Sequence, residues 1–111
     1  MKKFLVLYCA PASAKQQMAR ATPEQVKAGM ELWTSWMKKN GDAVTDLGAP
    51  VEAGKRIEAG SVSDGDNTTV GYSIVKSETM ITAIKMLHDH PHFHTPGGSI
   101  EIFEFLPMPG M

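Results

Sequence analysis

Apolar residues cluster at the two ends of the chain in a pattern that predicts strands. Phe4 to Cys9 is a short aromatic and β-branched run that is apolar on both faces, which is typical of a central strand covered on both sides. Ile100 to Leu106 repeats the pattern, with isoleucines on one face and phenylalanines on the other. Both segments therefore predict strands of a sheet whose second face also needs a cover.

Two segments between these ends have helical spacing. The first begins with Thr22 as cap, Pro23 in the first helical position and Gln25 completing a capping box, and it ends at Asn40-Gly41. The second is predicted to begin at a Ser77 cap and to end before Pro91. The apolar stripes are Val26, Met30, Trp33 and Met37 in the first helix, and Met80, Ile81, Ile84 and Leu87 in the second.

The remaining segments give weaker signals. Residues 43–49 predict a poorly alternating strand, and residues 12–21 a connecting loop or weak helical turn. Lys55 to Val62 and Thr69 to Ser77 flank a glycine-containing loop at 63–67 and predict a β-hairpin.

This element order favours an α+β fold. Strand, helix, strand, hairpin, helix and strand fit a ferredoxin-like βαββαβ sandwich with an additional hairpin strand, antiparallel and with both helices on one face. We expect one domain over residues 1–111. The simplest cover for the second sheet face is the same sheet of another subunit, which predicts a homodimer through the sheet face.

Composition excludes several classes of protein. Of 111 residues, 42% are hydrophobic and 21% charged, and the formal net charge is -1, which excludes a disordered chain and gives no basic footprint for nucleic acid. No apolar run approaches the ~20 residues of a membrane span. The single Cys9 excludes an internal disulfide, and Pro11 closely follows the short apolar start, so we expect a cytoplasmic protein rather than an exported one.

Four histidines at alternate positions are the outstanding chemical feature: His88, His90, His92 and His94. Imidazole is a common metal ligand, so His90, His92 and His94 are the candidates if a metal binds. The alternative is that backbone groups satisfy these rings, and we expect neither a physiological metal nor another cofactor.

Other residues suggest acid–base chemistry or ligand binding. His90 or His92 could move a proton if a carboxylate orients the ring, the candidates being Asp89, Glu24 and Asp46. Trp33, Trp36 and Tyr72 could line a cleft for an aromatic ligand, although tryptophans at helical spacing more often belong to the core.

The chain resembles the YCII-related family, including its DGPF-type branch. The resemblance rests on MKKFLVLY at the start, ATPEQ, DLGAP, VGYSIV, and LHDHPHFHTPGGSIEIFEFLPM near the end. The DGPF signature is half present, since Asp64-Gly65 is followed by Asp66 and Asn67. The resemblance implies a dimeric α/β barrel. Most members have no assigned reaction, a few are enzymes, including a dehydrochlorinase of chlorinated hydroquinones, and others are encoded beside alternative sigma factors.

Two functions from different classes follow. Some members are thought to pair a histidine near the start of the first helix with an aspartate before a proline, whereas this chain has Glu24 and His90 at those places. We therefore expect a small molecule to be bound or transformed near His88–His94, with His90, His92 and Glu24 as candidate catalytic residues and Trp36 and Tyr72 as candidate ligand contacts. The alternative is a non-catalytic ligand-binding or regulatory accessory protein of the sigma-factor-associated type.

Overall fold

The computed structural model describes residues 1–65 and 68–109. Short 3-10 helices, η1 (Gly41–Ala43) and η2 (Pro91–His94), accompany the main elements. The main elements in chain order are β1 (Lys2–Cys9), α1 (Ala14–Arg20), α2 (Pro23–Asn40), β2 (Val44–Asp46), β3 (Lys55–Glu58), β4 (Ser61–Asp64), β5 (Thr69–Ser77), α3 (Met80–Leu87) and β6 (Ser99–Glu104).

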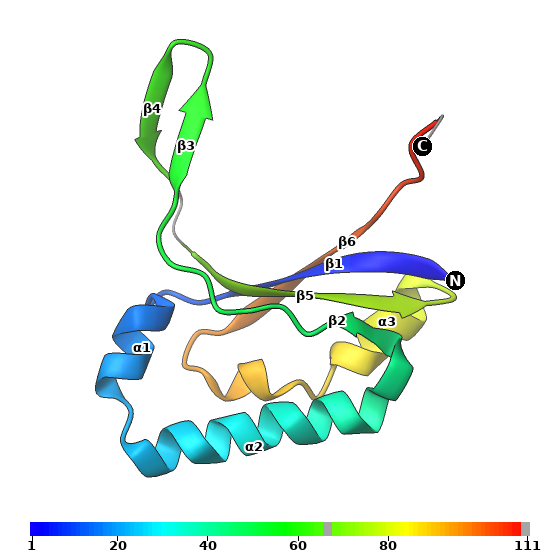
Figure 1. Cartoon of the computed structure of the whole chain (residues 1–111), viewed down its shortest axis with the longest axis horizontal. Coiled ribbons are helices and arrows are strands. Elements are labelled where there is room, and N and C mark those ends of the chain that lie inside the picture. The colour runs from blue at the N-terminus through cyan, green and yellow to red at the C-terminus, as the bar shows by residue number, and fades with distance from the viewer. Residues whose placement is uncertain (66–67, 110–111) are drawn as a thin grey trace.

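An antiparallel sheet forms the centre of the molecule. Its strand order is β2-β5-β1-β6, and the helices lie together on one face, which confirms the expected α+β class (Figure 1). β1 is central, as its two-sided apolar pattern predicts. Among the described residues, no helix combines the length and the hydropathy needed to cross a bilayer.

Capping residues set the helix boundaries. Thr22 Oγ1 accepts a hydrogen bond from the Gln25 backbone N–H, and the Gln25 side chain accepts one from the Thr22 N–H, which confirms the predicted capping box. Ser13 and Gln16 form the same reciprocal pair, so the segment predicted as a loop or weak helical turn contains a capped helix, α1. Gly41 ends α2 at φ 54°, a conformation that glycine adopts readily.

Two of the predicted boundaries are wrong. β3 pairs with β4 through a two-residue turn at Ala59-Gly60, whereas the predicted hairpin paired residues 55–62 with β5. β5 pairs with β1 and β2 instead, because this pairing places its apolar residues in the main sheet. The predicted loop at 63–67 is replaced by β4 up to Asp64, and its Asp66 and Asn67 lie outside the described residues.

The start of α3 also differs from the prediction. Ser77 belongs to β5, and Thr79 caps α3, its side chain accepting a hydrogen bond from the Thr82 N–H.

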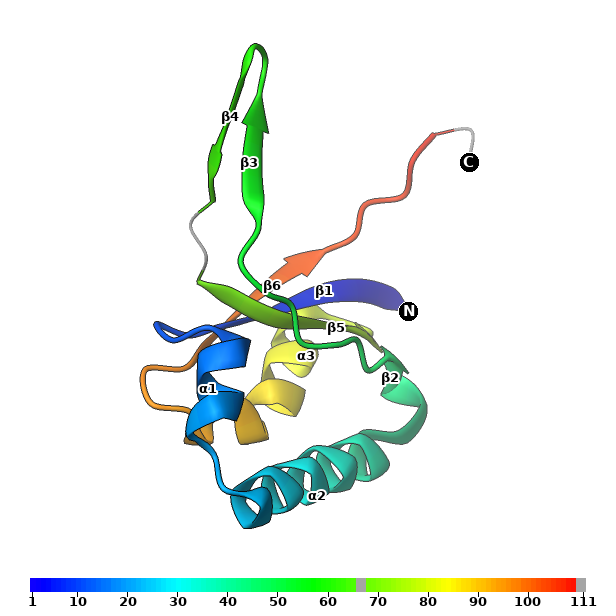
Figure 2. The ribbon, with the colours of Figure 1, turned by 60° about the vertical axis from the view of Figure 1, so that its left-hand side comes forward.

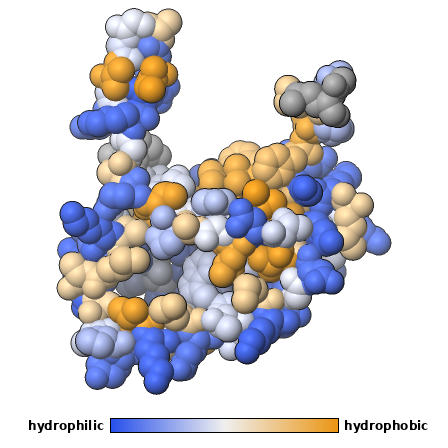
Figure 3. Space-filling model, in the orientation of Figure 1, coloured by the Kyte–Doolittle hydropathy of each residue, from blue (hydrophilic) through white to orange (hydrophobic). Residues whose placement is uncertain are grey.

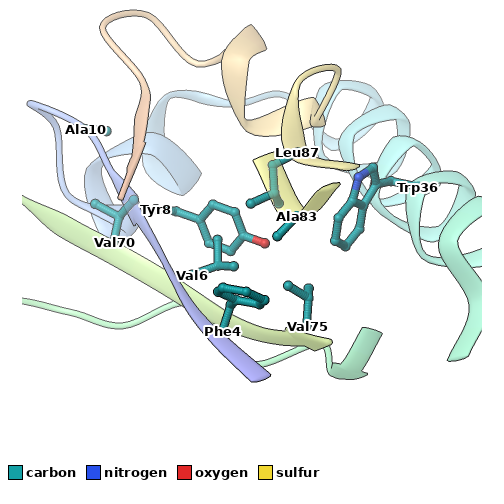
Figure 4. Packing of buried hydrophobic residues seen from close by; sticks show 9 residues of the cluster. All are labelled: Phe4, Val6, Tyr8, Ala10, Trp36, Val70, Val75, Ala83 and Leu87. Atoms are coloured by element: carbon teal, nitrogen blue, oxygen red, sulfur yellow. The ribbon is translucent and has the colours of Figure 1, made fainter. Parts of the chain in front are cut away.

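The core lies between the sheet and α3. Alternate residues of β1 point toward the helices and meet Val75 of β5 and two buried residues of α3 (Figure 4). The buried face of α3 carries Ala83 and Leu87, so Ile81 and Ile84 are exposed, contrary to the predicted stripe. The buried hydrophobic cluster is Phe4, Val6, Tyr8, Ala10, Trp36, Val70, Val75, Ala83 and Leu87.

The second face of the sheet carries no helix. The β3–β4 hairpin and the segment after β6 both rise on this side, away from the helices (Figures 1 and 2). Leu5 and Leu7 of β1 are half-buried there, and Leu5 pairs with the exposed Phe103 of β6. Phe105 continues the pairing of this segment with β1 just beyond the end of β6, since its N–H donates a hydrogen bond to the Lys3 carbonyl. We call this the outer face: Leu5, Leu7, Tyr72, Ile74, Phe103 and Phe105.

Candidate functional site

A cleft opens between the inner face of the sheet and the first two helices. Its volume is about 560 Å³, within the usual range for small-molecule sites, and the surface is visibly hollowed there (Figure 3). We call it the inner cleft. It is lined by Tyr8, Ala14, Gln17, Met18, Ala21, Gln25, Val26, Gly29, Met30, Trp33, Thr34, Leu47, Gly48, Ala49, Pro50, Val70, Gly71, Tyr72, His92 and Thr95.

α2 reaches the sheet mainly through Trp33, which contacts Tyr8 of β1, and through Trp36, which belongs to the core cluster. Its other main contacts are with η1 and η2, and η2 also contacts β6. Trp36 is the buried residue of α2, whereas Val26 and Met30 are exposed on the cleft wall and Trp33 is half-buried. The apolar stripe predicted for the core therefore lines an open site, and such apolar surface indicates ligand binding.

Aromatic rings and two histidines meet at the base of the cleft. The ring of His90 lies 4.8 Å from that of Tyr8, 4.5 Å from that of Trp33 and 4.4 Å from that of Trp36. Tyr8 also contacts Trp33 at 4.9 Å and His92 at 5.3 Å. Distant segments of the chain thus supply one cluster: β1, α2 and the turn into η2.

His90 is the buried centre of this cluster. Its Nδ1 accepts a hydrogen bond of 2.9 Å from the backbone N–H of His92, so the proton of the neutral ring lies on Nε2. That Nε2 is buried without a hydrogen-bond partner among the described residues. Burial lowers the pKa of His90 to about 3, and the neighbouring His92 adds to this effect while Asp89 opposes it. His90 is therefore a neutral packing residue near pH 7.

His92 has the same tautomer as His90 and lines the inner cleft. Its Nε2 lies 2.8 Å from the carbonyl oxygen of Cys9, and because a carbonyl only accepts, Nε2 carries the proton. The lone pair of the neutral ring is therefore on Nδ1. Gly98 lets the chain pass close to His92, since an added Cβ would lie 2.8 Å from the His92 carbonyl oxygen and 3.2 Å from its Nε2. His92 thus lines the cleft while being only 5% exposed, and its ring orientation is fixed by the Cys9 carbonyl.

The Tyr8 hydroxyl is tied into the sheet. It donates to Ser73 Oγ at 2.8 Å, and Ser73 Oγ donates to the Leu47 carbonyl at 2.6 Å. Burial raises the pKa of Tyr8 to about 12, with the Ser73 hydrogen bond partly opposing this. Tyr8 is therefore a neutral aromatic wall whose hydroxyl already has its partners.

The pH dependence of stability should report on His90. In the unfolded chain its pKa is near 6.5, so below that pH the unfolded state binds a proton that the folded state refuses until about pH 3. The free energy of unfolding should therefore fall as the pH drops through this window, by up to about 1.4 kcal/mol per pH unit. Urea unfolding between pH 7 and 4 measures the slope, and His90→Gln should flatten it. An equally steep slope in that variant would assign the effect to other groups.

The other predicted site residues are dispersed. Glu24 is exposed in the first turn of α2, while His90 contacts Trp33 and Trp36 further along, so the structure does not bring Glu24 and His90 together. Trp36 is in the core, and its Nε1–H donates to the Met86 carbonyl at 3.2 Å. Tyr72 borders the inner cleft, although its pairing with Leu7 places it on the outer face of the sheet.

The carboxylates proposed as partners of the histidines are engaged elsewhere. Asp89 forms an exposed ion pair with Lys39 at 2.6 Å, and this hydrogen bond lowers the pKa of Asp89. Asp46 accepts from the Gly48 N–H at 2.8 Å.

His94 is exposed beside a separate small hollow, so the three candidate metal ligands do not converge. Within residues 1–65 and 68–109, no set of three or more His, Cys, Asp or Glu side chains could hold a metal ion.

Sequence reasoning missed the contribution of Tyr8 and the amides of Gln17 and Gln25 to the cleft. The inward position of Tyr8 follows from its alternation with Phe4 and Val6, so this signal was available. Gln17 lies on α1, which the sequence predicted only as a connecting loop or weak helical turn.

Comparison with known proteins gives one informative relationship. No family model and no curated protein matches the chain. A solved structure that does match is 5-chloro-2-hydroxyhydroquinone dehydrochlorinase (TftG) of Burkholderia phenoliruptrix, in complex with 2,5-dihydroxybenzoquinone. The TM-score is 0.53 at 12% identity, and the match covers 96% of this chain and 94% of that one. At this identity the match shows a shared fold.

Proposed function

We propose that the chain is a YCII-related protein that binds a small molecule in the inner cleft, with His92 as the group that accepts a proton from it. The observation that carries this proposal is the oriented His92 ring at an open, mostly apolar cleft. The structurally similar dehydrochlorinase, whose structure holds a small molecule, supports such a use of the fold.

His90 then acts as a positioning residue. Its Nδ1 holds the backbone of His92, and its ring is fixed by three aromatic neighbours. His92 in turn is oriented by the Cys9 carbonyl, where many acid–base histidines use a carboxylate. Glu24 has no part in this arrangement.

A non-catalytic binding role is the second candidate. It is favoured by the absence of any carboxylate among the described residues that line the cleft, since a carboxylate would stabilise the charged imidazole after proton transfer. Both functions require the cleft to bind a ligand, so binding is the first property to test.

Filling the cleft should abolish binding. In a ligand-observed NMR screen of about a hundred neutral and charged ring compounds, we expect several to bind the wild-type protein. Val26→Trp places a large ring on the cleft wall and should remove this binding. Lys27→Trp changes the adjacent exposed residue, which does not line the cleft, and should preserve it. The proposal is wrong if no compound binds, or if all binders are unaffected by Val26→Trp.

A further inference from the structure

The short helix α1 lies at one end of the space between the sheet and α2 and is weakly anchored there (Figures 1 and 2). We infer that α1 is a lid of the inner cleft, which packs onto a bound ligand with Met18 as its main contact. The lid depends on the proposed function, because it closes on the ligand of that site.

The chain is held on both sides of α1. Before the helix, the Ala10 N–H donates to the Thr68 carbonyl at 2.8 Å. After it, the capping box at Thr22 holds the start of α2. Only Ala21 and Thr22 separate the two helices, and both have extended backbone. α1 can therefore move about two anchored points while the sheet and α2 stay in place.

Between these points, α1 is held mainly by its own residues. None of its seven residues is buried, and among the described residues its hydrogen bonds all join members of the segment 12–21. No described helix or strand packs extensively on it, and Ala14 is the residue that packs partly against the core. An isolated helix of this length is marginal in water.

The other short helix, α3, shows the contrast. It has eight residues, but it buries Ala83 and Leu87 and packs on β5. Opening α3 would expose part of the core, whereas opening α1 exposes little that is buried. We therefore expect α1 to open locally far more often than α3.

The apolar stripe of α1 faces the cleft. Ala14, Met18 and Ala21 recur at i, i+4 and i+7, and all three line the cleft. Met18 is 59% exposed there, while the charged Lys15 and Arg20 point away from the lining. An apolar ligand would bury Met18 and so supply the packing partner that the stripe lacks. A methionine suits this role, because its flexible side chain adapts to different shapes.

Ligand binding and closure of α1 are then coupled. A ligand that contacts Met18 in the closed arrangement shifts α1 toward that arrangement. By linkage, a change that destabilises closed α1 must weaken ligand binding. Because the ligand enters while the cleft is open, the weakening should appear in the dissociation rate.

Hydrogen exchange with N-phenyl-1-naphthylamine tests the lid. This probe is neutral and fluoresces strongly in apolar sites, and it should bind the wild-type cleft but not Val26→Trp. Without the probe, we expect the α1 amides to exchange at least ~10-fold faster than those of α3. Saturating probe should slow α1 exchange at least ~10-fold in the wild-type protein and leave it unchanged in Val26→Trp. An α1 as protected as α3 without the probe, or one that the bound probe does not protect, is not a lid.

Two capping variants give a matched comparison. Ser13→Ala removes the cap of α1 and Thr79→Ala removes that of α3, and neither residue belongs to the described lining of the cleft. The loss of a cap changes a helix equilibrium about five-fold, so Ser13→Ala should raise the dissociation rate of the probe about five-fold in stopped-flow fluorescence. It should leave the urea midpoint unchanged. Thr79→Ala should lower the urea midpoint and leave the dissociation rate unchanged.

The outcomes separate the lid from the proposed function. If the probe binds the cleft of the wild-type protein but Ser13→Ala leaves its dissociation rate unchanged, the lid is wrong and the binding function stands. If the probe does not bind, or binds Val26→Trp equally well, the proposed function fails and the lid fails with it.

Discussion

Replacing His90 with alanine should lower the free energy of unfolding by about 3 kcal/mol, the order found when large buried side chains are truncated. The His90 ring is 1% exposed and fills the space between Tyr8, Trp33 and Trp36. Its removal leaves a cavity and also leaves the His92 backbone N–H without its acceptor. Urea unfolding at pH 7, followed by tryptophan fluorescence, measures the loss.

His90→Phe separates packing from hydrogen bonding at this position. The phenyl ring restores most of the volume and removes the unpartnered Nε2–H, but it cannot accept from the His92 N–H. We expect this variant to lose only about 1 kcal/mol, since one hydrogen bond is exchanged for the removal of a buried donor. Equal losses for His90→Ala and His90→Phe would show that hydrogen bonding, rather than packing, accounts for the role of His90.

The main features of the fold were predictable because local signals agreed with the tertiary structure. The apolar run of β1 indicated a central strand, and the Thr22 box and Gly41 fixed both ends of α2. The predicted hairpin was wrong because the segment of β5 has the clearest strand pattern in its region. The weaker strand that precedes it in sequence was therefore assigned to it as a partner. Its real partners, β1 and β2, are distant in sequence, and no local pattern specifies them.

The candidate site was less predictable than the fold. The histidine run pointed to the right segment, but alternation alone suggested convergence of His90, His92 and His94. The 3-10 turn after Pro91 instead directs His90 inward, His92 to the cleft and His94 to the surface. Likewise, helical spacing predicted that the α2 stripe is apolar, but whether the stripe faces a cleft or the core depends on tertiary contacts of α2 with η1 and η2, which no local pattern specifies.

The outer face of the sheet provides the second large expected effect. We propose that it is covered by the same face of a second copy of the chain, as in the dimeric barrel that the family resemblance implies. Phe103 and Phe105 are 49% and 45% exposed there, and Leu5 and Leu7 are half-buried beside them. Burying one such side chain fully stabilises by ~1.5–3 kcal/mol relative to leaving it in water. The several partly exposed side chains together can therefore offset much of the entropy lost on association.

Phe103→Asp should dissociate this dimer. Phe103 pairs with Leu5 in the register of β6 and β1, which places it on the outer face beside the central strand. A carboxylate there would be buried against its own symmetry mate without a partner, so we expect the dissociation constant to rise by at least ~100-fold. Sedimentation equilibrium at low micromolar concentration compares the variant with the wild-type protein.

Ile81→Asp is the matched control, because Ile81 is an apolar residue that is 68% exposed on α3, on the helical side of the sheet. It introduces the same charge on the opposite face, so a sheet-face dimer should tolerate it. If the wild-type protein sediments as a folded monomer, no second copy covers the outer face. If Ile81→Asp dissociates a dimer that Phe103→Asp leaves intact, the subunits meet through their helices. Circular dichroism of both variants separates dissociation from unfolding, since a folded Phe103→Asp monomer should retain the helical signal of α2 and α3.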